Sequence, residues 1–258
     1  MKIRNLTAGI CAALLIAAAA GCGGTAKNKS STASADTVSQ TAAFTTPGER
    51  LSRLPQASPE WVTKLAAAQN AKQLFIVAGY EGSTAWVSMH ERDTDGNWKM
   101  TASTPGYIGR AGLGKTKEGD AKTPVGTFRF NRAFGIADDP GCAIPYIKAD
   151  DDTYWSGDSK ISYNQLVSLK DHPDLNTADS EHILDYQYQY QYCLNISYNE
   201  SGTAGAGSAI FLHCLGDRKP FTGGCVAIPE EQMYFVMRHV DPECVVVIDS
   251  MESLGAEF

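Results

Sequence analysis

In the central part of the chain, short apolar runs alternate with turn residues. Residues 73–80 (QLFIVAGY) form one apolar run, and residues 84–93 (TAWVSMHERD) alternate apolar with polar positions. Residues 81–83 (EGS) lie between them, and two such runs joined by a short glycine-containing segment predict a β-hairpin. The Asp-Gly pair at 95–96 predicts a second turn before another strand over residues 98–109.

Further apolar runs predict more strands and few helices. The other predicted strands cover residues 126–135, 193–199, 208–214 and 244–250, and the predicted helices cover residues 162–171 and 229–240. A short helix is also expected within residues 58–69, with Ser58 as its N-cap and Pro59 in its first turn. This element content predicts a mainly β domain with a small α complement.

A run of tyrosines precedes one predicted strand. In residues 185–193 (DYQYQYQYC), tyrosines and glutamines alternate strictly. As a strand, the run would place Tyr186, Tyr188, Tyr190 and Tyr192 on one face. An aromatic platform for a sugar or peptide is one interpretation, but a half-buried strand is preferred because aromatic residues favour strands.

The N-terminus has the features of an export signal. Lys2 and Arg4 precede an apolar run over residues 8–21, which is too short to span a bilayer as a stable helix. The run ends in Ala-Ala-Gly-Cys at residues 19–22, which resembles the lipobox of bacterial lipoproteins, whose cysteine is acylated. We therefore expect Cys22 to be the lipid attachment site of an extracytoplasmic, membrane-anchored lipoprotein. A plain signal peptide with an incidental cysteine is the alternative.

Three regions follow from these patterns. We expect a lipoprotein signal peptide at 1–21, a flexible Ser/Thr/Ala-rich tether at 22–57 and a folded domain at 58–258, with its core at about 72–250. Hydrophobic residues make up 43% of the chain and charged residues 20%, as in ordinary globular proteins. The net charge of −7 provides no basic field for gathering phosphates, so we expect no nucleic-acid partner.

The cysteines and histidines point to one candidate site. Outside the cytoplasm cysteines usually pair, and an odd number remains when Cys11 and Cys22 are set aside. The remaining five are Cys142, Cys193, Cys214, Cys225 and Cys244. Cys225 is the best candidate for a free thiol, because the glycines before it allow a tight turn that exposes backbone N–H groups.

Nucleophilic chemistry at this cysteine requires two further groups. A thiol attacking a carbonyl needs a base or cation that lowers its pKa, and donors for the oxyanion that forms. His213 can supply the first, and the N–H groups around Gly224 and Cys225 the second. An inert buried cysteine beside a glycine turn is the structural alternative.

Two motifs together resemble a known family. Residues 119–128 (GDAKTPVGTF) contain a Thr-Pro-x-Gly-x-Phe segment, and the later His213 is followed by Thr222-Gly-Gly-Cys225. In this order they resemble the L,D-transpeptidase catalytic domain (YkuD-type) of bacterial wall enzymes, over roughly residues 72–250. The resemblance implies a β-sandwich-like, mixed-sheet domain with the cysteine loop at one end, and it requires no metal or organic cofactor.

The resemblance also implies roles for individual residues. Cys225 would be the nucleophile and His213 the general base and acid, with the backbone carbonyl of Cys214 orienting the imidazole and the Gly224 N–H binding the oxyanion. Thr222 and Gly223 would contact substrate. Many family members have glycine or serine after the histidine, and arginine or asparagine two residues after the cysteine. This chain has Cys214 and Ala227 at those positions, so any substrate contact made at the second position is missing or moved.

The implied reaction is a two-step acyl transfer on peptidoglycan stem peptides. Cys225 would attack the L-centre carbonyl of the third residue, a diamino acid, and release the terminal D-Ala. An amine from a neighbouring stem would resolve the thioester to a 3→3 cross-link, and water would give L,D-carboxypeptidase activity instead.

Three other interpretations remain open. His172, Asp179 and His182 loosely match a zinc peptidase, although the downstream Glu-x-x-His segment of such enzymes is absent. Papain-like and NlpC-type peptidases place cysteine before histidine, and only His239 follows Cys225. The spacing of apolar residues in 229–240 predicts that His239 is a solvated residue at a helix C-terminus. A non-catalytic wall-binding lipoprotein is the third interpretation.

Overall fold

The computed structural model describes residues 55–216 and 219–257. The strands of its main sheet close into a ring, because β3 pairs with β4 at the far end of the path β4-β12-β11-β10-β5-β13-β2-β3. The ring strands are β2 (Gln73–Gly79), β3 (Thr84–Arg92), β4 (Trp98–Tyr107), β5 (Gly126–Gly135), β10 (Cys193–Ile196), β11 (Phe211–Cys214), β12 (Val226–Ile228) and β13 (Val245–Ser250). Short β1 (Gln56–Ala57) extends β4, and β6 (Tyr146–Lys148) extends β5.

The pairings are mixed, as expected from the resemblance. Most neighbours are antiparallel, including the predicted hairpin β2–β3, whereas β11–β12, β13–β2 and β5–β6 are parallel. The helical complement is small: α2 (Glu60–Lys64), η1 (Ala66–Gln69), η2 (Thr177–Asp179), η3 (Ile183–Asp185), α3 (Glu230–His239) and α4 (Met251–Leu254). The predicted fold class is confirmed. No helix in the described ranges is long and apolar enough to span a membrane.

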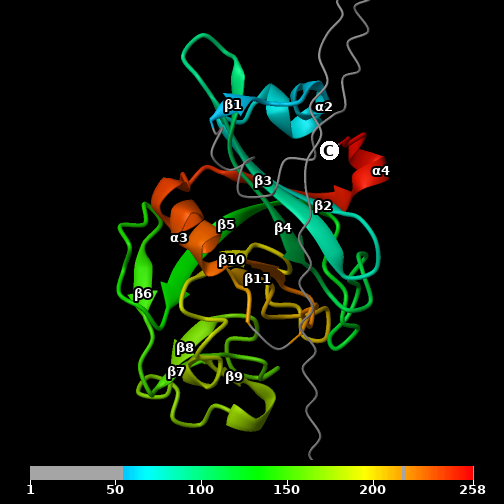
Figure 1. Cartoon of the computed structure of the whole chain (residues 1–258). Coiled ribbons are helices and arrows are strands. Elements are labelled where there is room, and N and C mark those ends of the chain that lie inside the picture. Colours follow the sequence, from blue (N-terminus) through cyan, green and yellow to red (C-terminus); the bar gives the residue numbers. More distant parts are fainter. Residues whose placement is uncertain (1–54, 217–218, 258) are drawn as a thin grey trace, which may run out of the picture. The chain divides into compact units, whose positions relative to one another are not determined.

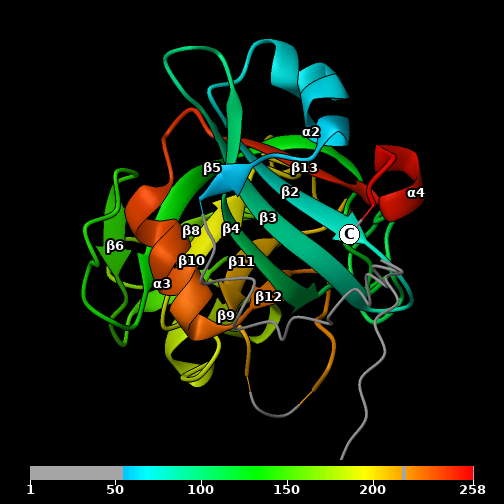
Figure 2. The same cartoon turned by 45° about the horizontal axis from the view of Figure 1, so that its top comes forward.

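A second, three-stranded sheet lies at one end of the main sheet. It consists of β7 (Thr153–Trp155), β8 (Leu166–Ser168) and β9 (Glu181–His182) in the order β8-β7-β9. Figures 1 and 2 show this insert next to β10 and β11, on the far side of the main sheet from α2. All three strands of this insert lie in the one chain segment that connects β6 to β10.

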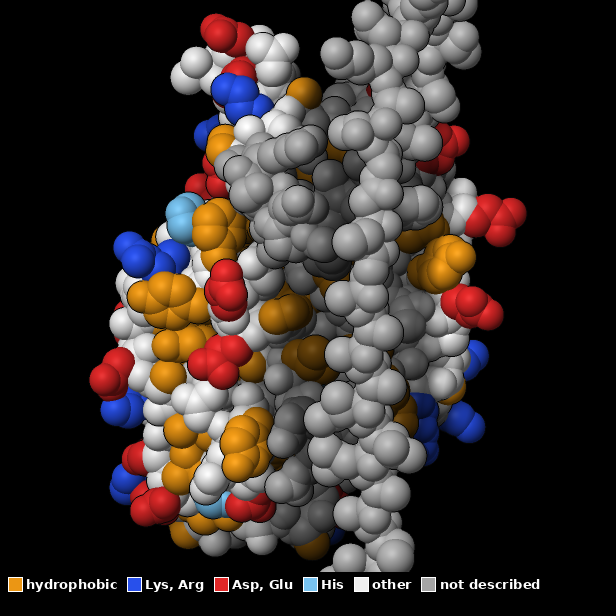
Figure 3. Space-filling view, in the orientation of Figure 1, with side chains coloured by type: hydrophobic (Ala, Val, Ile, Leu, Met, Phe, Trp, Pro, Cys, Tyr) orange, Lys and Arg blue, Asp and Glu red, His pale blue; other side chains and the backbone are white. Residues whose placement is uncertain are grey.

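The buried core has three clusters, two of which lie on opposite faces of β10, β11 and β12. Every residue of these three strands is buried, because both of their faces are covered. One face packs into the cluster that contains Leu194, Leu212 and α3, and the other packs against aromatic residues of the insert around Trp155. On the face seen in Figure 3, acidic and basic side chains are interspersed with apolar ones.

The helix predicted over residues 162–171 is wrong. The segment forms turns around β8, and Ser162 and Asn164 have φ of 46° and 61°, in the left-handed region. The Asn164 amide donates to the backbone carbonyls of Tyr198 and Asn199 at 3.0 and 2.9 Å. Strand pairing with β7 and these long-range bonds override the local helical pattern.

The strand predicted for the tyrosine run is also wrong. Residues 186–192 form turns, in which the Tyr190 N–H donates to the Tyr186 carbonyl at 2.8 Å. Their rings therefore stack with centroids 4.6 Å apart, while Tyr188 is 59% exposed and Tyr190 only 4%. The two residues are four positions apart, as on one face of a helix, and this spacing rather than strand alternation brings their rings together.

Ser58 is not a helix cap. The residue at the cap position of α2 is Pro59, and no side chain caps this helix end. The Ser58 hydroxyl instead forms a 2.8 Å hydrogen bond with Nδ1 of His90. The prediction for the helix at residues 229–240, which is α3, holds: Met233, Val236, Met237 and Val240 are buried.

Candidate active site

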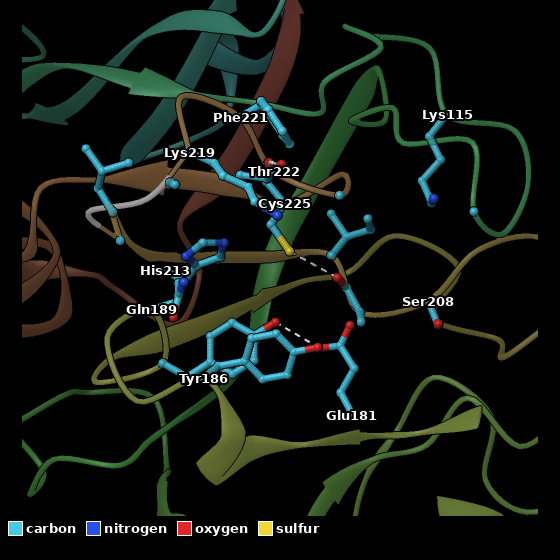
Figure 4. Close-up of a pocket in the computed structure, with 18 of the residues that line it drawn as sticks. Lys115, Glu181, Tyr186, Gln189, Ser208, His213, Lys219, Phe221, Thr222 and Cys225 are labelled. Atoms are coloured by element: carbon cyan, nitrogen blue, oxygen red, sulfur yellow. Dashed lines mark hydrogen bonds between the residues drawn. The ribbon is translucent and has the colours of Figure 1, made fainter. Parts of the chain in front are cut away.

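His213 and Cys225 lie on the same face of two adjacent strands. Side chains alternate along β11, so Leu212 and Cys214 enter the main core while His213 faces the insert. His213 is in register with Ala227 on the parallel strand β12, and Cys225 lies two residues before Ala227. Both side chains therefore line a cavity of about 480 Å³, into which they point in Figure 4.

The imidazole of His213 is held in one tautomer. Its Nδ1 forms a 2.8 Å hydrogen bond with the backbone carbonyl of Cys214. A carbonyl oxygen only accepts, so Nδ1 carries the hydrogen and Nε2 has a free lone pair. Burial lowers the pKa of His213 to about 4, although the bond to Cys214 opposes this shift. The ring is therefore neutral at pH 7, and Nε2 can accept a proton.

The thiol of Cys225 is also neutral. Cys225 is 7% exposed, its thiol donates to the carbonyl of Ala209 at 3.1 Å, and the Phe211 N–H donates to its sulfur at 3.4 Å. Burial raises the pKa of Cys225 to about 12, with a further contribution from the nearby Glu181 carboxylate. In the described residues no hydrogen bond joins His213 to Cys225. The two groups share a cavity as an uncharged acid and base rather than as an ion pair.

The loop that carries the cysteine is fixed by its own threonine. The Thr222 hydroxyl donates to the Cys225 carbonyl at 2.7 Å and accepts from the Gly224 N–H at 3.0 Å. The Gly224 N–H, expected to bind an oxyanion, thus already has an acceptor. Gly224 has φ of 150°, and a Cβ there would lie 2.8 Å from the carbonyl oxygen of Lys122, so this position requires glycine.

The two motifs of the sequence meet at Thr123. Its hydroxyl donates to the Gly224 carbonyl at 2.7 Å and accepts from the Gly109 N–H at 2.9 Å, and the residue is fully buried. The Thr-Pro-x-Gly-x-Phe segment therefore clamps the cysteine loop. Its role could not be read from the sequence, because the two ends of this bond are 101 residues apart.

The cavity also contains Tyr190, which the sequence suggested only as part of a possible aromatic platform, and three charged residues that the sequence did not single out. Tyr190 packs its ring edge against His213, with centroids 5.5 Å apart, and donates its hydroxyl to Glu181 at 2.8 Å. Burial raises the pKa of Glu181. Lys115 and Glu118 also line the cavity. The signal for Lys115 and Glu118 in the sequence is the charged cluster GKTKEGD, just before the Thr-Pro motif.

The other predicted residues have the following places. Gly223 and Ala227 line the cavity and offer no functional side chain to a substrate. Cys142, Cys193, Cys214, Cys225 and Cys244 are all free thiols. Cys214 points away from Cys225, as strand alternation predicts, and lies in the main core. Cys22 and the proposed signal and tether lie outside the described residues, apart from residues 55–57.

The histidines of the rival interpretations lie elsewhere. His239 is exposed at the end of α3, where its ring stacks on Phe235, as the helical pattern predicts. His182 forms a 3.0 Å hydrogen bond with Asp185, and His172 lines a separate cavity beside β8. In the ranges that the structure describes, no three metal-ligating side chains converge.

Comparison with known proteins identifies the family. The model of the YkuD family, L,D-transpeptidase catalytic domain, matches residues 85–248. This range covers more than half of the chain, and the chain belongs to the L,D-transpeptidase catalytic domain (YkuD) family. No curated protein matches it.

Solved structures resemble the chain only distantly. The helical cell shape determining protein Pgp2 from Campylobacter jejuni is 17% identical, with 74% of this chain and 54% of that chain covered and a TM-score of 0.38. The avibactam carbamoyl enzyme of Ldtfm is 15% identical, with 70% and 49% covered and a TM-score of 0.32. The chain spans about half the length of these structures.

Proposed function

We propose that the protein is a cysteine acyltransferase that acts on peptidoglycan stem peptides as an L,D-transpeptidase. The observation that carries this proposal is the shared cavity of His213 and Cys225, in which Nδ1 of the imidazole is tied to the Cys214 carbonyl and Nε2 is unprotonated. A neutral base beside a neutral thiol suits general-base catalysis, in which the proton leaves sulfur as sulfur attacks the carbonyl.

Every proton that is moved in the two steps has a donor and an acceptor. Nε2 of His213 takes the thiol proton while the Cys225 sulfur adds to the carbonyl of the diamino acid. The amide C–N bond then breaks, and the imidazolium gives this proton to the departing D-Ala amine, which leaves a thioester. An acceptor amine attacks the thioester, its proton passes to Nε2 and then to the departing sulfur, and the cross-link forms.

The oxyanion of each step needs hydrogen-bond donors near the sulfur. The N–H of Cys225 lies close to its own sulfur and is one such donor. The Gly224 N–H can serve as the second if the Thr222 hydroxyl releases it and retains its own bond to the Cys225 carbonyl. Thr222 and Gly223 then form the wall beside the reacting carbonyl.

The products of purified stem tetrapeptides test the proposed reaction. The full chain should release D-Ala and form dimers joined between two third residues, as read by mass spectrometry. Shortened stems without dimers would instead indicate the L,D-carboxypeptidase, in which water replaces the acceptor amine. If wild-type protein left the peptides intact and formed no covalent adduct with them, both activities would be refuted. This result would favour the non-catalytic wall-binding protein.

We further propose that Cys22 is acylated and anchors the enzyme at the outer face of a membrane, from which residues 22–57 reach the cell wall. The support is the apolar run that ends in Ala-Ala-Gly-Cys. Cell fractionation tests this: wild-type protein should sediment with membranes, and Cys22→Ala should not, because acyl chains supply the anchoring energy. Wild-type protein found wholly in the soluble fraction would refute the anchor.

A further inference from the structure

The cavity contains a buried cation that the proposed mechanism does not use. The Lys115 side chain is only 2% exposed, and the residue lines the same cavity as Cys225. Its stem packs against Gly207, where a Cβ would lie 2.4 Å from Cε of the lysine. Gly207, with φ of 114°, thus provides space that any other residue would fill. Figure 4 shows Lys115 and His213 on opposite sides of Cys225.

The ammonium group of Lys115 has one donor to spare. It donates to the Lys117 carbonyl at 3.2 Å and to Oδ1 of Asp120 at 3.1 Å. A lysine ammonium carries three N–H donors, so one has no acceptor within the described residues. Burial of a charged group with an unused donor costs free energy. A ligand that enters the cavity can supply the missing acceptor.

Asp120 holds this lysine in place. Burial opposes ionisation of Asp120, but the backbone N–H groups of Thr116, Lys122 and Lys117 and the Lys115 ammonium lower its pKa. The carboxylate is therefore ionised, and its acceptor sites are occupied by these four donors. The pair fixes the position of the Lys115 nitrogen, while the third donor of the lysine stays available.

The charge of Lys115 also reaches the reacting sulfur. Its ammonium opposes the upward shift in the pKa of Cys225 that burial causes. An amino-acid residue spans at most ~3.6 Å along an extended chain. A leaving group one residue long therefore keeps its carboxylate in the cavity that holds the scissile carbonyl.

We infer that Lys115 binds the C-terminal carboxylate of the peptide whose last amide bond is attacked by Cys225. This inference rests on the proposed acyl transfer and gives it a substrate rule: the leaving group is a single residue with a free carboxylate. An ammonium–carboxylate bond away from water is short and strong. Glu118 lines the same cavity and repels a carboxylate, so it disfavours a position for it near its own side chain.

Lys219 is the competing cation of this cavity. It is exposed, and its ammonium lies 5.9 Å from the centre of the Phe221 ring. Because solvent screens an exposed lysine, we expect it to discriminate weakly between a charged and a neutral peptide end. It is therefore the matched control for Lys115.

The experiment compares two stem tetrapeptides, one with a free C-terminal carboxylate and one with a C-terminal carboxamide. The rate of Cys225 acylation is measured by intact-protein mass spectrometry for wild type, Lys115→Met, Lys115→Arg and Lys219→Met. Wild type should favour the free acid by about 10- to 100-fold in kcat/KM. Lys115→Met should lose this preference, because its acylation by the free-acid peptide should slow while its acylation by the carboxamide peptide should not. Lys115→Arg and Lys219→Met should keep most of the preference.

Each contrary result has its own meaning. If Lys115→Met slowed acylation by both peptides equally, Lys115 would only stabilise its loop, and the inference would be overturned. Loss of the preference for the free acid in Lys219→Met would also overturn the inference. Equal rates of wild type on acid and amide would overturn it whether or not any variant folds. Acylation by neither peptide would instead refute the proposed function itself, and the inference with it.

Discussion

His90 and His213 are both buried, and burial lowers the pKa of each to about 4. Their surroundings differ. His90 forms 2.8 Å hydrogen bonds through both ring nitrogens, with Ser58 and Ser88. Only Nδ1 of His213 has a partner in the described residues, and its ring faces the cavity of Cys225.

The difference teaches how a catalytic histidine is distinguished from a structural one. Neither burial nor a lowered pKa separates the two sites, because desolvation acts on both rings alike. A structural histidine satisfies both nitrogens, since an unsatisfied buried group costs stability. A catalytic base must leave one nitrogen available at a place that substrate can reach.

The largest effect should come from removing the available nitrogen. His213→Ala should slow acylation of Cys225 by about 100-fold or more, the usual loss when a general base is removed. His239→Ala is the control, because that residue is exposed at the end of α3, and its acylation rate should stay near wild type. The reverse ranking of the two rates would show that the base has been misassigned.

The neutral state of the pair gives a pH prediction. The pKa of Cys225 is raised to about 12, so its thiolate fraction should increase about tenfold per pH unit between pH 6 and 9. The rate of alkylation by iodoacetamide, mapped to Cys225 by peptide mass spectrometry, should follow this slope. Cys225→Ser provides the background from the other thiols. A plateau in rate between pH 5 and 7 would instead reveal a thiolate–imidazolium pair.

The clamp between the two motifs should have an intermediate effect. Thr123→Val keeps the shape of the side chain but leaves the Gly224 carbonyl and the Gly109 N–H unsatisfied, which should cost about 1–3 kcal/mol of unfolding free energy. Acylation should slow as the cysteine loop loosens. Thr123→Ser retains the hydroxyl and should restore both values in denaturant titration and acylation assays. Equal behaviour of the valine and serine variants would exclude a role for this hydroxyl.

The smallest effect on chemistry should come from the structural histidine. His90→Ala should lower the free energy of unfolding by about 1–3 kcal/mol, because Ser58 and Ser88 lose their buried partner. The acylation rate of the folded protein should change less than about twofold. A loss of acylation as large as in His213→Ala would break the distinction between the two sites.

Local patterns predicted the parts of the fold that depend on neighbouring residues. The hairpin β2–β3 and the buried face of α3 follow from apolar spacing and turn residues, and the structure agrees. The opposite orientations of His213 and Cys214 follow from strand alternation. In these elements the periodicity of the side chains along one strand or helix is sufficient to say which of them are buried.

The failed predictions have two different causes. Leu166–Ser168 pair with β7 and Asn164 bonds to the backbone of Tyr198 and Asn199, so contacts outside the segment override its helical pattern. The tyrosine run instead closes a local turn in which Tyr186 stacks on Tyr190, a spacing that strand alternation does not describe. The clamp at Thr123 and the buried Lys115–Asp120 pair were also invisible in the sequence. A charged lysine is usually solvated, so only its surroundings reveal that it faces the cavity.

The central claim is that Cys225 is the nucleophile of an acyl transfer assisted by His213. The most direct measurement is the intact mass of the protein during incubation with a stem tetrapeptide, followed by peptide mapping. The account predicts a thioester adduct equal to the peptide without its terminal D-Ala, located at Cys225 and absent in a folded Cys225→Ser variant. An adduct on another residue, or full turnover by the serine variant, would contradict it.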